Sequence, residues 1–211
     1  MFRYVVVEGP IGVGKSSLAR LLAKEFNARA FLEKPEENPF LGRFYQERRK
    51  YAFQTQIFFL LQRFQQQKDI AQFDLFNQVT LCDYLFAKDR IFASLNLDDN
   101  ELSLYEQIYN LLSGQIPVPD LIIFLQAKPE VLLHRIKARS HAYEKDIDLE
   151  YLKTLTEAYN YFFFHYTQSP LLIVDTSEID FVKRKEDLDQ LVREIKQMKK
   201  GTCYFIPLRS K

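Results

Sequence analysis

Short apolar runs alternate with segments of helical periodicity along this chain of 211 residues. Five runs are typical of buried β-strands, and they cover residues 4–7, 30–32, 79–82, 121–125 and 171–174. Apolar positions recur at helical spacing over residues 16–26, 51–64, 102–112, 131–139, 149–164 and 186–199. Strands that alternate with helices predict a five-stranded parallel sheet covered by helices on both faces, which is a three-layer α/β/α fold.

The first predicted strand leads directly into a glycine-rich loop. The loop matches the phosphate-binding pattern G-x-x-x-x-G-K-[ST], and its residues are Gly9, Pro10, Ile11, Gly12, Val13, Gly14, Lys15 and Ser16, followed by Ser17. The backbone N–H groups of such a loop and the start of the next helix attract phosphate oxygens. Lys15 is expected to reach the β- and γ-phosphates of ATP, and Ser16 to bind Mg²⁺. A glycine turn that fits by chance is the alternative, but the predicted strand and helix on either side favour the phosphate loop.

Composition argues against several classes of partner. Lys and Arg total 29 against 28 Asp and Glu, a net charge of +1, which disfavours nucleic acid and membranes. The two cysteines form no C-x-x-C pair, so no zinc site or disulfide framework is expected and a reducing compartment is favoured. No apolar run approaches transmembrane length. We expect one cytoplasmic domain over residues 1–211, and leave open whether its tail, residues 201–211, is ordered.

A phosphate loop occurs in GTPases, ATPases and small-molecule kinases, so other residues must separate these classes. The guanine-reading N-K-x-D motif and the D-x-x-G switch motif are absent, which disfavours a GTPase. A kinase needs an acceptor oxygen beside the γ-phosphate and positive charge around the transferring group. Glu33 follows the second predicted strand, so it would lie at the same rim of the sheet as the loop and could accept a hydroxyl proton. A surface pair with Lys34 is the alternative for Glu33.

Positive charge for the triphosphate has a candidate in one predicted helix. Arg135 and Arg139 lie four residues apart there and therefore share one face. Two guanidiniums side by side suit the oxygens of a triphosphate. An exposed helix with ordinary basic residues is the alternative, and the two arginines alone would favour it.

Together, these motifs resemble the deoxynucleoside kinases, the group that contains deoxycytidine, deoxyguanosine and bacterial deoxyadenosine kinases. The resemblance is carried by the phosphate loop, Glu33, Tyr45, Phe53-Gln54, Arg135-Ile136, Arg139, Glu144 and the run 149–152. It extends to about Asp175. It implies a P-loop kinase fold with a helical lid over about residues 135–148, a requirement for ATP and Mg²⁺, and a homodimer.

The resemblance also implies roles for individual residues. Glu33 would be the base that deprotonates a nucleoside 5′-hydroxyl, while Tyr45 and Glu144 would hold the 3′-hydroxyl of the sugar. Gln54 would bind the edge of the base, because its amide carries both donors and an acceptor. Arg135 and Arg139 would belong to the lid that closes over the ATP phosphates. A solvated amide is the alternative for Gln54, and a core tyrosine for Tyr45.

The chain departs from the family pattern after the third predicted strand. The family usually carries a carboxylate, then Arg, then Ser or Thr, whereas this chain has Cys82-Asp83-Tyr84-Leu85 and lacks the arginine. In the register we prefer, Asp83 replaces the carboxylate and binds Mg²⁺. In the other register, Asp83 falls at the arginine position and the carboxylate is lost.

The next segment resembles the family's base pocket but is one residue shorter than the preferred register requires. Lys88 or Arg90 would supply the missing positive charge. Asp89 would face the edge of a purine, and Phe92 would stack on the base. Ordinary helix residues are the alternative for all four. In the lid, His141 stands near the place of a family arginine, and we interpret it as a surface residue.

These observations predict ATP- and Mg²⁺-dependent transfer of the γ-phosphoryl group to the 5′-hydroxyl of a deoxynucleoside, in nucleotide salvage, with a purine as the first expectation. The expected catalytic residues are Lys15, Glu33, Asp83 and Arg135. A nucleoside monophosphate kinase, such as a thymidylate kinase, is the alternative enzyme. A nucleotide-binding module that has lost catalysis is the alternative of a different class, and the altered residue Tyr84 keeps it open.

Overall fold

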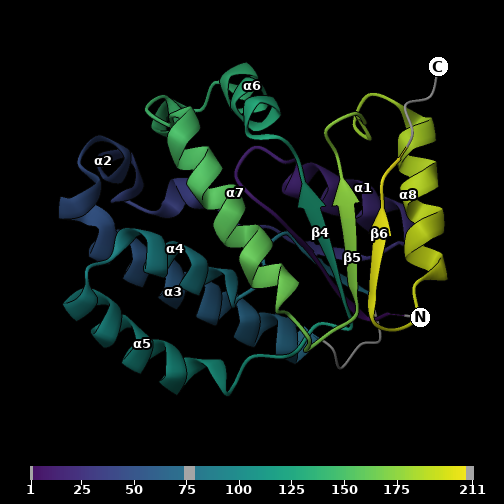
Figure 1. Cartoon of the computed structure of the whole chain (residues 1–211). Coiled ribbons are helices and arrows are strands. Elements are labelled where there is room, and N and C mark those ends of the chain that lie inside the picture. Colours follow the sequence, from purple (N-terminus) through teal and green to yellow (C-terminus); the bar gives the residue numbers. More distant parts are fainter. Residues whose placement is uncertain (1, 74–78, 208–211) are drawn as a thin grey trace.

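A computed structural model describes residues 2–73 and 79–207 of the chain. Its centre is a sheet of six parallel strands in the order β2-β3-β1-β4-β5-β6 (Figure 1). The strands are β1 (Tyr4–Glu8), β2 (Arg29–Phe31), β3 (Thr80–Cys82), β4 (Leu121–Gln126), β5 (Leu171–Asp175) and β6 (Thr202–Phe205). The prediction of a parallel α/β sheet is confirmed, but the predicted count of five strands is wrong.

The additional strand, β6, lies within residues 201–211, for which the sequence predicts only a tail. Gly201 adopts a φ of 73° and precedes the strand. β6 pairs with β5 at the edge of the sheet, and three of its four residues are exposed. Because backbone hydrogen bonds rather than buried side chains hold β6, no buried apolar run marks it in the sequence.

The central strands consist almost entirely of buried apolar side chains. Val6, Ile122 and Val174 each have 0% of their surface exposed. Such burial is expected of a parallel sheet that is covered on both faces. In Figure 1, α7 and the group α3, α4 and α5 lie on one side of the sheet and α8 lies on the other. Helix α1 contacts β1, β2 and β3.

The helices agree with the predicted segments except for two short ones. They are α1 (Lys15–Glu25), α2 (Leu41–Gln46), α3 (Arg48–Phe73), α4 (Lys88–Asn96), α5 (Asp99–Ser113), α6 (Pro129–Arg139), α7 (Leu149–Phe164) and α8 (Lys185–Gln197), with 3₁₀ turns at Pro35–Glu37 and Ala142–Glu144. The periodicity does not predict α2 and α4. Helix α3 extends beyond its predicted range at both ends. Within the described ranges, no helix has the length and apolarity needed to span a bilayer.

The segment between α6 and α7 is bounded by two local signals. Helix α6 ends at Arg139, where Ser140 takes a left-handed φ of 54°. Helix α7 begins at Leu149, because the carboxylate of Asp148 accepts a hydrogen bond of 2.7 Å from Tyr151 N. Residues 140–148 therefore form a short connection between two stable helices, within the range predicted for the lid.

The parallel sheet brings three acidic residues to one rim. Glu8 ends β1, Glu33 follows β2, and Asp83 follows β3. Their strands are adjacent, since β3 pairs with both β1 and β2. The backbone N–H of Glu33 donates to Asp83 Oδ1 at 2.7 Å. The sheet thus gathers these carboxylates beside the phosphate loop, as the order of elements predicts.

Candidate active site

A cavity of about 620 Å³ lies at this rim of the sheet. Its wall comes from the phosphate loop, the segment after β2, one face of α3, one face of α4, and the connection between α6 and α7. Helices α2 and α7 complete the wall. The volume falls within the range of small-molecule sites, so the cavity can hold a ligand of that size.

The phosphate loop depends on glycine for its shape. Gly9 and Gly12 adopt φ values of 151° and 85°, which residues with a side chain rarely reach. A Cβ on Gly12 would lie 2.7 Å from Ile136 Cγ1 of α6, and a Cβ on Gly9 would collide with the carbonyl oxygen of Leu125. Without these glycines the loop could not close against β4 and α6.

Lys15, the first residue of α1, folds back onto the loop that precedes it. Its Nζ donates to the carbonyl oxygens of Gly9 at 2.7 Å and Pro10 at 3.1 Å. Burial and the nearby charge of Lys88 lower the pKa of Lys15 to about 8, against the opposing effect of Glu8 and other carboxylates. An anion bound in the loop would raise the pKa of Lys15 again, because it would stabilise the charged ammonium.

Ser16 and Asp83 meet although they lie far apart in the sequence. The hydroxyl of Ser16 donates to Asp83 Oδ2, and the other carboxylate oxygen accepts from the backbone of Glu33. Burial and the charge of Glu33 raise the pKa of Asp83. The two side chains predicted as metal ligands are therefore brought together, and both offer oxygen, the donor that Mg²⁺ prefers.

Glu33 lies at the centre of a charged network. Its Oε1 accepts from Arg63 Nε at 2.7 Å, and Arg63 Nη2 lies 2.7 Å from the same oxygen. Its Oε2 accepts from Lys88 Nζ at 3.0 Å. Burial opposes ionisation, but Arg63 and Lys88 outweigh it and lower the pKa of Glu33 to about 2. The carboxylate is therefore ionised at any physiological pH, which the alternative of a surface pair with Lys34 does not explain.

Lys88 and Arg90, the two residues proposed to supply the missing positive charge, differ in burial and in their contacts. The side chain of Lys88 is 3% exposed, lines the cavity and touches Glu33. The side chain of Arg90 is 53% exposed and pairs with Glu106 of α5 at 2.9 Å. Of the two, Lys88 lies at the cavity, and the structure places Arg90 away from it. Residues two positions apart on a helix point in nearly opposite directions, which explains the difference.

The glutamine at the cavity is Gln56 and not Gln54. Gln54, the glutamine predicted to bind the base, is exposed and does not line the cavity. Gln56 is 5% exposed, and its Nε2 donates to the carbonyl oxygen of Asp89 at 2.9 Å and to the carboxylate of Asp89. The two glutamines are about 200° apart around the helix axis, so only one of them can face the cavity.

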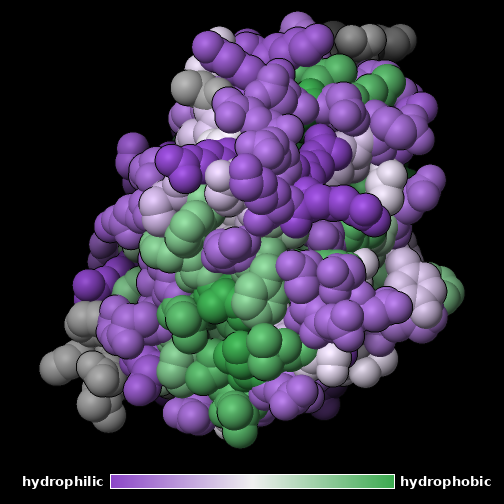
Figure 2. Space-filling model, turned by 90° about the vertical axis from the view of Figure 1, so that its left-hand side faces the viewer, coloured by the Kyte–Doolittle hydropathy of each residue, from purple (hydrophilic) through white to green (hydrophobic). Residues whose placement is uncertain are grey.

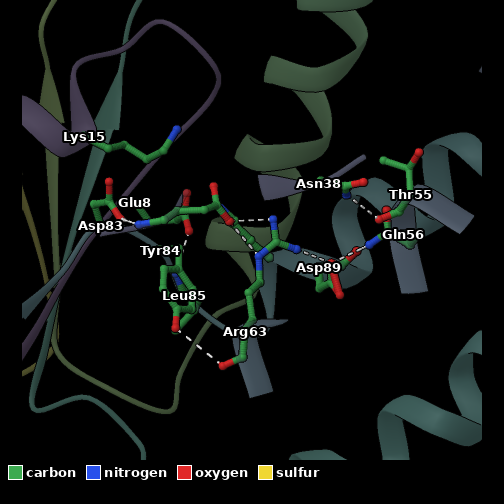
Figure 3. A network of polar contacts seen from close by, with 12 residues as sticks. Glu8, Lys15, Asn38, Thr55, Gln56, Arg63, Asp83, Tyr84, Leu85 and Asp89 are labelled. Carbon is green, nitrogen blue, oxygen red and sulfur yellow. Dashed lines mark hydrogen bonds and ion pairs between the residues drawn. The ribbon is translucent and has the colours of Figure 1, made fainter. Parts of the chain in front are cut away.

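Asp89 lies outside the cavity wall and bonds two residues that form it, Gln56 and Arg63. It is fully buried and does not line the cavity itself. Its Oδ1 accepts from Gln56 and from Arg63 Nη1. Burial raises the pKa of Asp89 to about 6, although Arg63 and Lys88 favour the charged form. Figure 3 shows Arg63 between Asp83 on the side of the phosphate loop and Asp89 on the side of Gln56.

Aromatic and acidic side chains from other helices complete the wall. Phe92 of α4 lines the cavity and meets the ring of Tyr159 edge to face, with centroids 6.1 Å apart. Tyr45 of α2 and Glu144 of the 3₁₀ turn both line it as predicted, and both are buried. Glu144 accepts from Arg139 Nε at 2.8 Å.

The two arginines of α6 have separate environments. Arg139 lines the cavity, whereas Arg135 does not. The guanidinium of Arg135 donates to the carbonyl oxygens of Val13 at 3.4 Å, Thr176 at 2.7 Å and Ile179 at 3.3 Å. Burial lowers its pKa. In this structure, Arg135 therefore joins the phosphate loop to the segment after β5 and does not face the cavity together with Arg139.

Sequence reasoning missed two charged residues of the site. Glu8 is fully buried and accepts from Gly9 N at 2.8 Å, Leu85 N at 2.6 Å and Tyr159 OH at 3.2 Å, so it ties the phosphate loop to the loop after β3 and to α7. Arg63 is 4% exposed on α3. Arg63 follows Gln56 by seven residues, which places both on the same face of the helix. This spacing is the sequence signal that could have identified Arg63.

Comparison with known proteins agrees with this geometry. The family model described as deoxynucleoside kinase matches residues 5–200. Deoxyguanosine kinase from Bacillus subtilis (strain 168) is 34% identical over 200 residues, which cover 92% of this chain and 97% of that protein. Deoxyadenosine kinase from Dictyostelium discoideum is 38% identical over 197 residues, which cover 92% of this chain and 78% of that protein.

A solved structure shares the fold as well as part of the sequence. It is the deoxyadenosine kinase from M. mycoides with the products dCMP and a flexible dCDP bound, and it matches with a TM-score of 0.81 and 27% identity. The match covers 92% of this chain and 100% of that chain. The family match over most of the chain, together with a phosphate loop that opens onto a cavity lined by Glu33 and Asp83, leads to one conclusion: this chain belongs to the deoxynucleoside kinase family.

Proposed function

We propose that this chain transfers the γ-phosphoryl group of ATP to the 5′-hydroxyl of a deoxynucleoside, with a purine as the favoured base. The observation that carries the proposal is the position of Glu33, an ionised carboxylate that lines the same cavity as Lys15 and Ser16. Family membership supports the acceptor. Relatives named deoxyguanosine kinase and deoxyadenosine kinase support the purine.

In this reaction Glu33 accepts the proton of the 5′-hydroxyl. The hydroxyl oxygen bonds to the γ-phosphorus while the bond from that phosphorus to the bridging oxygen breaks, and ADP leaves. A carboxylate with a pKa of about 2 is a weak base. A weak base suffices when the transition state is loose, because the acceptor then loses its proton late. Lys15 and the loop N–H groups hold the leaving phosphates.

Mg²⁺ would be held by Ser16 Oγ and Asp83, whose side chains already meet. The described residues include no group of three or more His, Cys, Asp or Glu that could hold a metal ion, so phosphate oxygens and water would supply the other ligands. When bound, the ion would neutralise charge on the β- and γ-phosphates. The oxygen chemistry of the two side chains fits this ion.

The sugar and base would occupy the far end of the cavity. Tyr45 and Glu144 are the candidates for the 3′-hydroxyl, as the family resemblance implies. Gln56 takes the role first expected of Gln54: its Nε2 is committed to Asp89, so its Oε1 is left to accept from a donor on the base. Adenine and guanine both carry such donors. Phe92 offers a ring for stacking.

Closure of residues 135–148 would exclude water from the transferring group. Arg139 lies at the cavity in the connecting region, and Arg135 reaches the phosphate loop from α6. We propose that both arginines contribute to ATP binding, Arg139 by contact with phosphate and Arg135 by holding the loop. We also propose that residues 1–211 form a single domain and that the lid, residues 135–148, is the part of it that moves.

A homodimer is supported by the apolar surface of α3 and α5. Leu61 of α3 and Leu104 and Leu111 of α5 are 49%, 47% and 76% exposed. Figure 2 shows apolar side chains gathered in the lower half of the face where these helices lie. Exposed apolar patches of this kind mark protein interfaces. Light scattering on the purified chain tests the proposal: the mass of two copies would support the dimer, and the mass of one copy would contradict it.

The free state of both cysteines supports a reducing compartment such as the cytoplasm as the location of the protein.

The reaction is tested by incubating the purified chain with ATP, Mg²⁺ and each deoxynucleoside. We expect a deoxynucleoside 5′-monophosphate and ADP in equal amounts. Glu33→Gln should lower kcat by about 10²- to 10⁴-fold, the range for losing a positioned base. Glu37→Gln is the matched control, because Glu37 bonds Lys34 and Gln62 on the surface and does not line the cavity.

The same assay separates the alternatives. Phosphorylation of deoxynucleoside monophosphates without phosphorylation of deoxynucleosides would assign a monophosphate kinase instead. ATP binding without turnover of any acceptor would leave a nucleotide-binding module. Wild-type turnover in Glu33→Gln would remove Glu33 from the mechanism.

A further inference from the structure

Lys88 is a buried cation whose hydrogen-bonding capacity is only partly used. Within the described part of the chain, its Nζ donates to Glu33 Oε2 at 3.0 Å and lies 5.7 Å from the centroid of the Tyr84 ring. An ammonium group has three N–H donors, so donors remain for a ligand. Burial of a charge is costly unless it is paired and hydrogen-bonded, so a bound anion that accepts from the remaining donors would stabilise Lys88 in its place.

Lys88 lies between the two chemical parts of the cavity. It lines the cavity together with Lys15, and it is close enough that its charge lowers the pKa of Lys15. It also touches Glu33, the proposed base. A phosphoryl group that leaves the phosphate loop for an oxygen beside Glu33 would therefore pass Lys88.

Two arginines of the cavity wall are already bonded to carboxylates. Arg63 bonds Glu33 through Nε and Nη2 and bonds Asp89 through Nη1. Arg139 pairs with the carboxylate of Glu144 in this structure, and its proposed contact is with the phosphates of ATP. Arg63 is therefore held by two carboxylates, whereas Lys88 can keep its bond to Glu33 and still donate to a phosphate oxygen.

We propose that Lys88 is a catalytic residue that binds the transferring phosphoryl group from the acceptor side. The inference rests on the proposed kinase reaction. Lys88 takes no part in the proton transfer: the proton of the 5′-hydroxyl goes to Glu33, and the ammonium of Lys88 balances negative charge on the phosphoryl oxygens. Its bond to Glu33 also holds that carboxylate in place for the hydroxyl.

Three variants test this role. Lys88→Met removes the charge and keeps a side chain of similar length, and we expect kcat to fall by about 100- to 1,000-fold with the KM for ATP little changed. Lys88→Arg keeps a positive charge and should recover at least about one-tenth of the wild-type kcat. Arg90→Met is the matched control: it removes a cation two residues away on the same helix, where Arg90 pairs with Glu106 on the surface, and it should keep the wild-type kcat.

The separate kinetic constants distinguish the chemical role from a structural one. A distorted cavity would raise the KM for ATP and for the deoxynucleoside, whereas loss of a cation that acts on the transferring group should lower kcat and leave both KM values little changed. Lys88→Gln provides a second neutral variant if thermal denaturation shows that Lys88→Met does not fold.

The outcomes are distinct. If folded neutral variants keep the wild-type kcat, or fall only as much as Arg90→Met, Lys88 is not catalytic while the kinase reaction stands. If the wild type makes no deoxynucleoside monophosphate, the proposed function itself fails. A large loss of kcat in both neutral variants, little change in either KM and recovery of kcat in Lys88→Arg would support Lys88 as the acceptor-side cation.

Discussion

The two ends of the cavity are built in different ways. The phosphate end is a continuous loop and the start of one helix, residues 9–17, so its shape depends on local backbone geometry. The base end is assembled from side chains of α3 and α4, among them Gln56, Arg63 and Asp89, which meet only after folding. A local motif predicts the first kind of site well, whereas the second depends on which face of each helix turns inward.

The electrostatics of the two ends also differ. At the phosphate end, Lys15 has its pKa lowered to about 8 and forms no ion pair with a carboxylate among the described residues, so a bound anion would favour its charged form. At the base end, Arg63 and Asp89 are paired with each other in the free protein. The phosphate end would therefore gain most from its ligand's charge, and the base end from hydrogen bonds and shape.

The largest effect should follow a change of backbone at the phosphate end. Gly12→Ala places a Cβ against Ile136 and Leu132 at a φ of 85°, so we expect a loss of more than about 1 kcal/mol of stability and at least about a tenfold rise in the KM for ATP. Gly42→Ala is the matched control, because a Cβ on Gly42 meets nothing within 4 Å and α2 should gain stability. Thermal denaturation and ATP titration measure both. Equal behaviour of the two variants would contradict the dependence on loop geometry.

A smaller and more selective effect should follow a change at the base end. Gln56→Leu removes the amide that faces the cavity, so the KM for the deoxynucleoside should rise by about 3- to 10-fold while the KM for ATP stays the same. Gln54→Leu, on the exposed face of the same helix, should change neither constant. Steady-state kinetics with both substrates varied provides the measurement. Loss of nucleoside affinity in Gln54→Leu instead would restore the first interpretation of α3.

The smallest effect should appear in the pH dependence. Asp89 is ionised above its pKa of about 6, where it bonds Gln56 and Arg63, and protonation below that pH weakens its hold on Arg63. We expect kcat/KM for the deoxynucleoside to fall several-fold between about pH 6.5 and pH 5. Glu33 does not titrate in this range, since its pKa is about 2.

Asp89→Asn isolates this titration. The variant has no ionisable group at the position, so its acid limb near pH 6 should disappear while any decline near the pKa of Lys15, about 8, persists. An unchanged limb at pH 6 in Asp89→Asn would mean that another group controls nucleoside binding.

Helix α3 shows why the base end could not be predicted fully. Its apolar residues lie on several faces, so the hydrophobic pattern does not define which side is buried. Leu61, an apolar residue within the predicted helical range 51–64, is 49% exposed, whereas Arg63 and Gln67 are 4% and 0% exposed. A helix that faces a ligand cavity carries polar groups on its buried side, and periodicity alone then assigns the wrong face.

The sequence by itself determined the parallel strands of the buried core, the phosphate loop and the family, because each depends on residues that are close together in the chain. It also identified Glu33 and Asp83, since parallel strands bring their carboxyl ends to one rim. Only the tertiary structure selected Gln56 over Gln54 and Lys88 over Arg90. The physical reason is that the rotation of a packed helix is set by all its contacts at once, and a rotation of half a turn exchanges the buried residue for the exposed one.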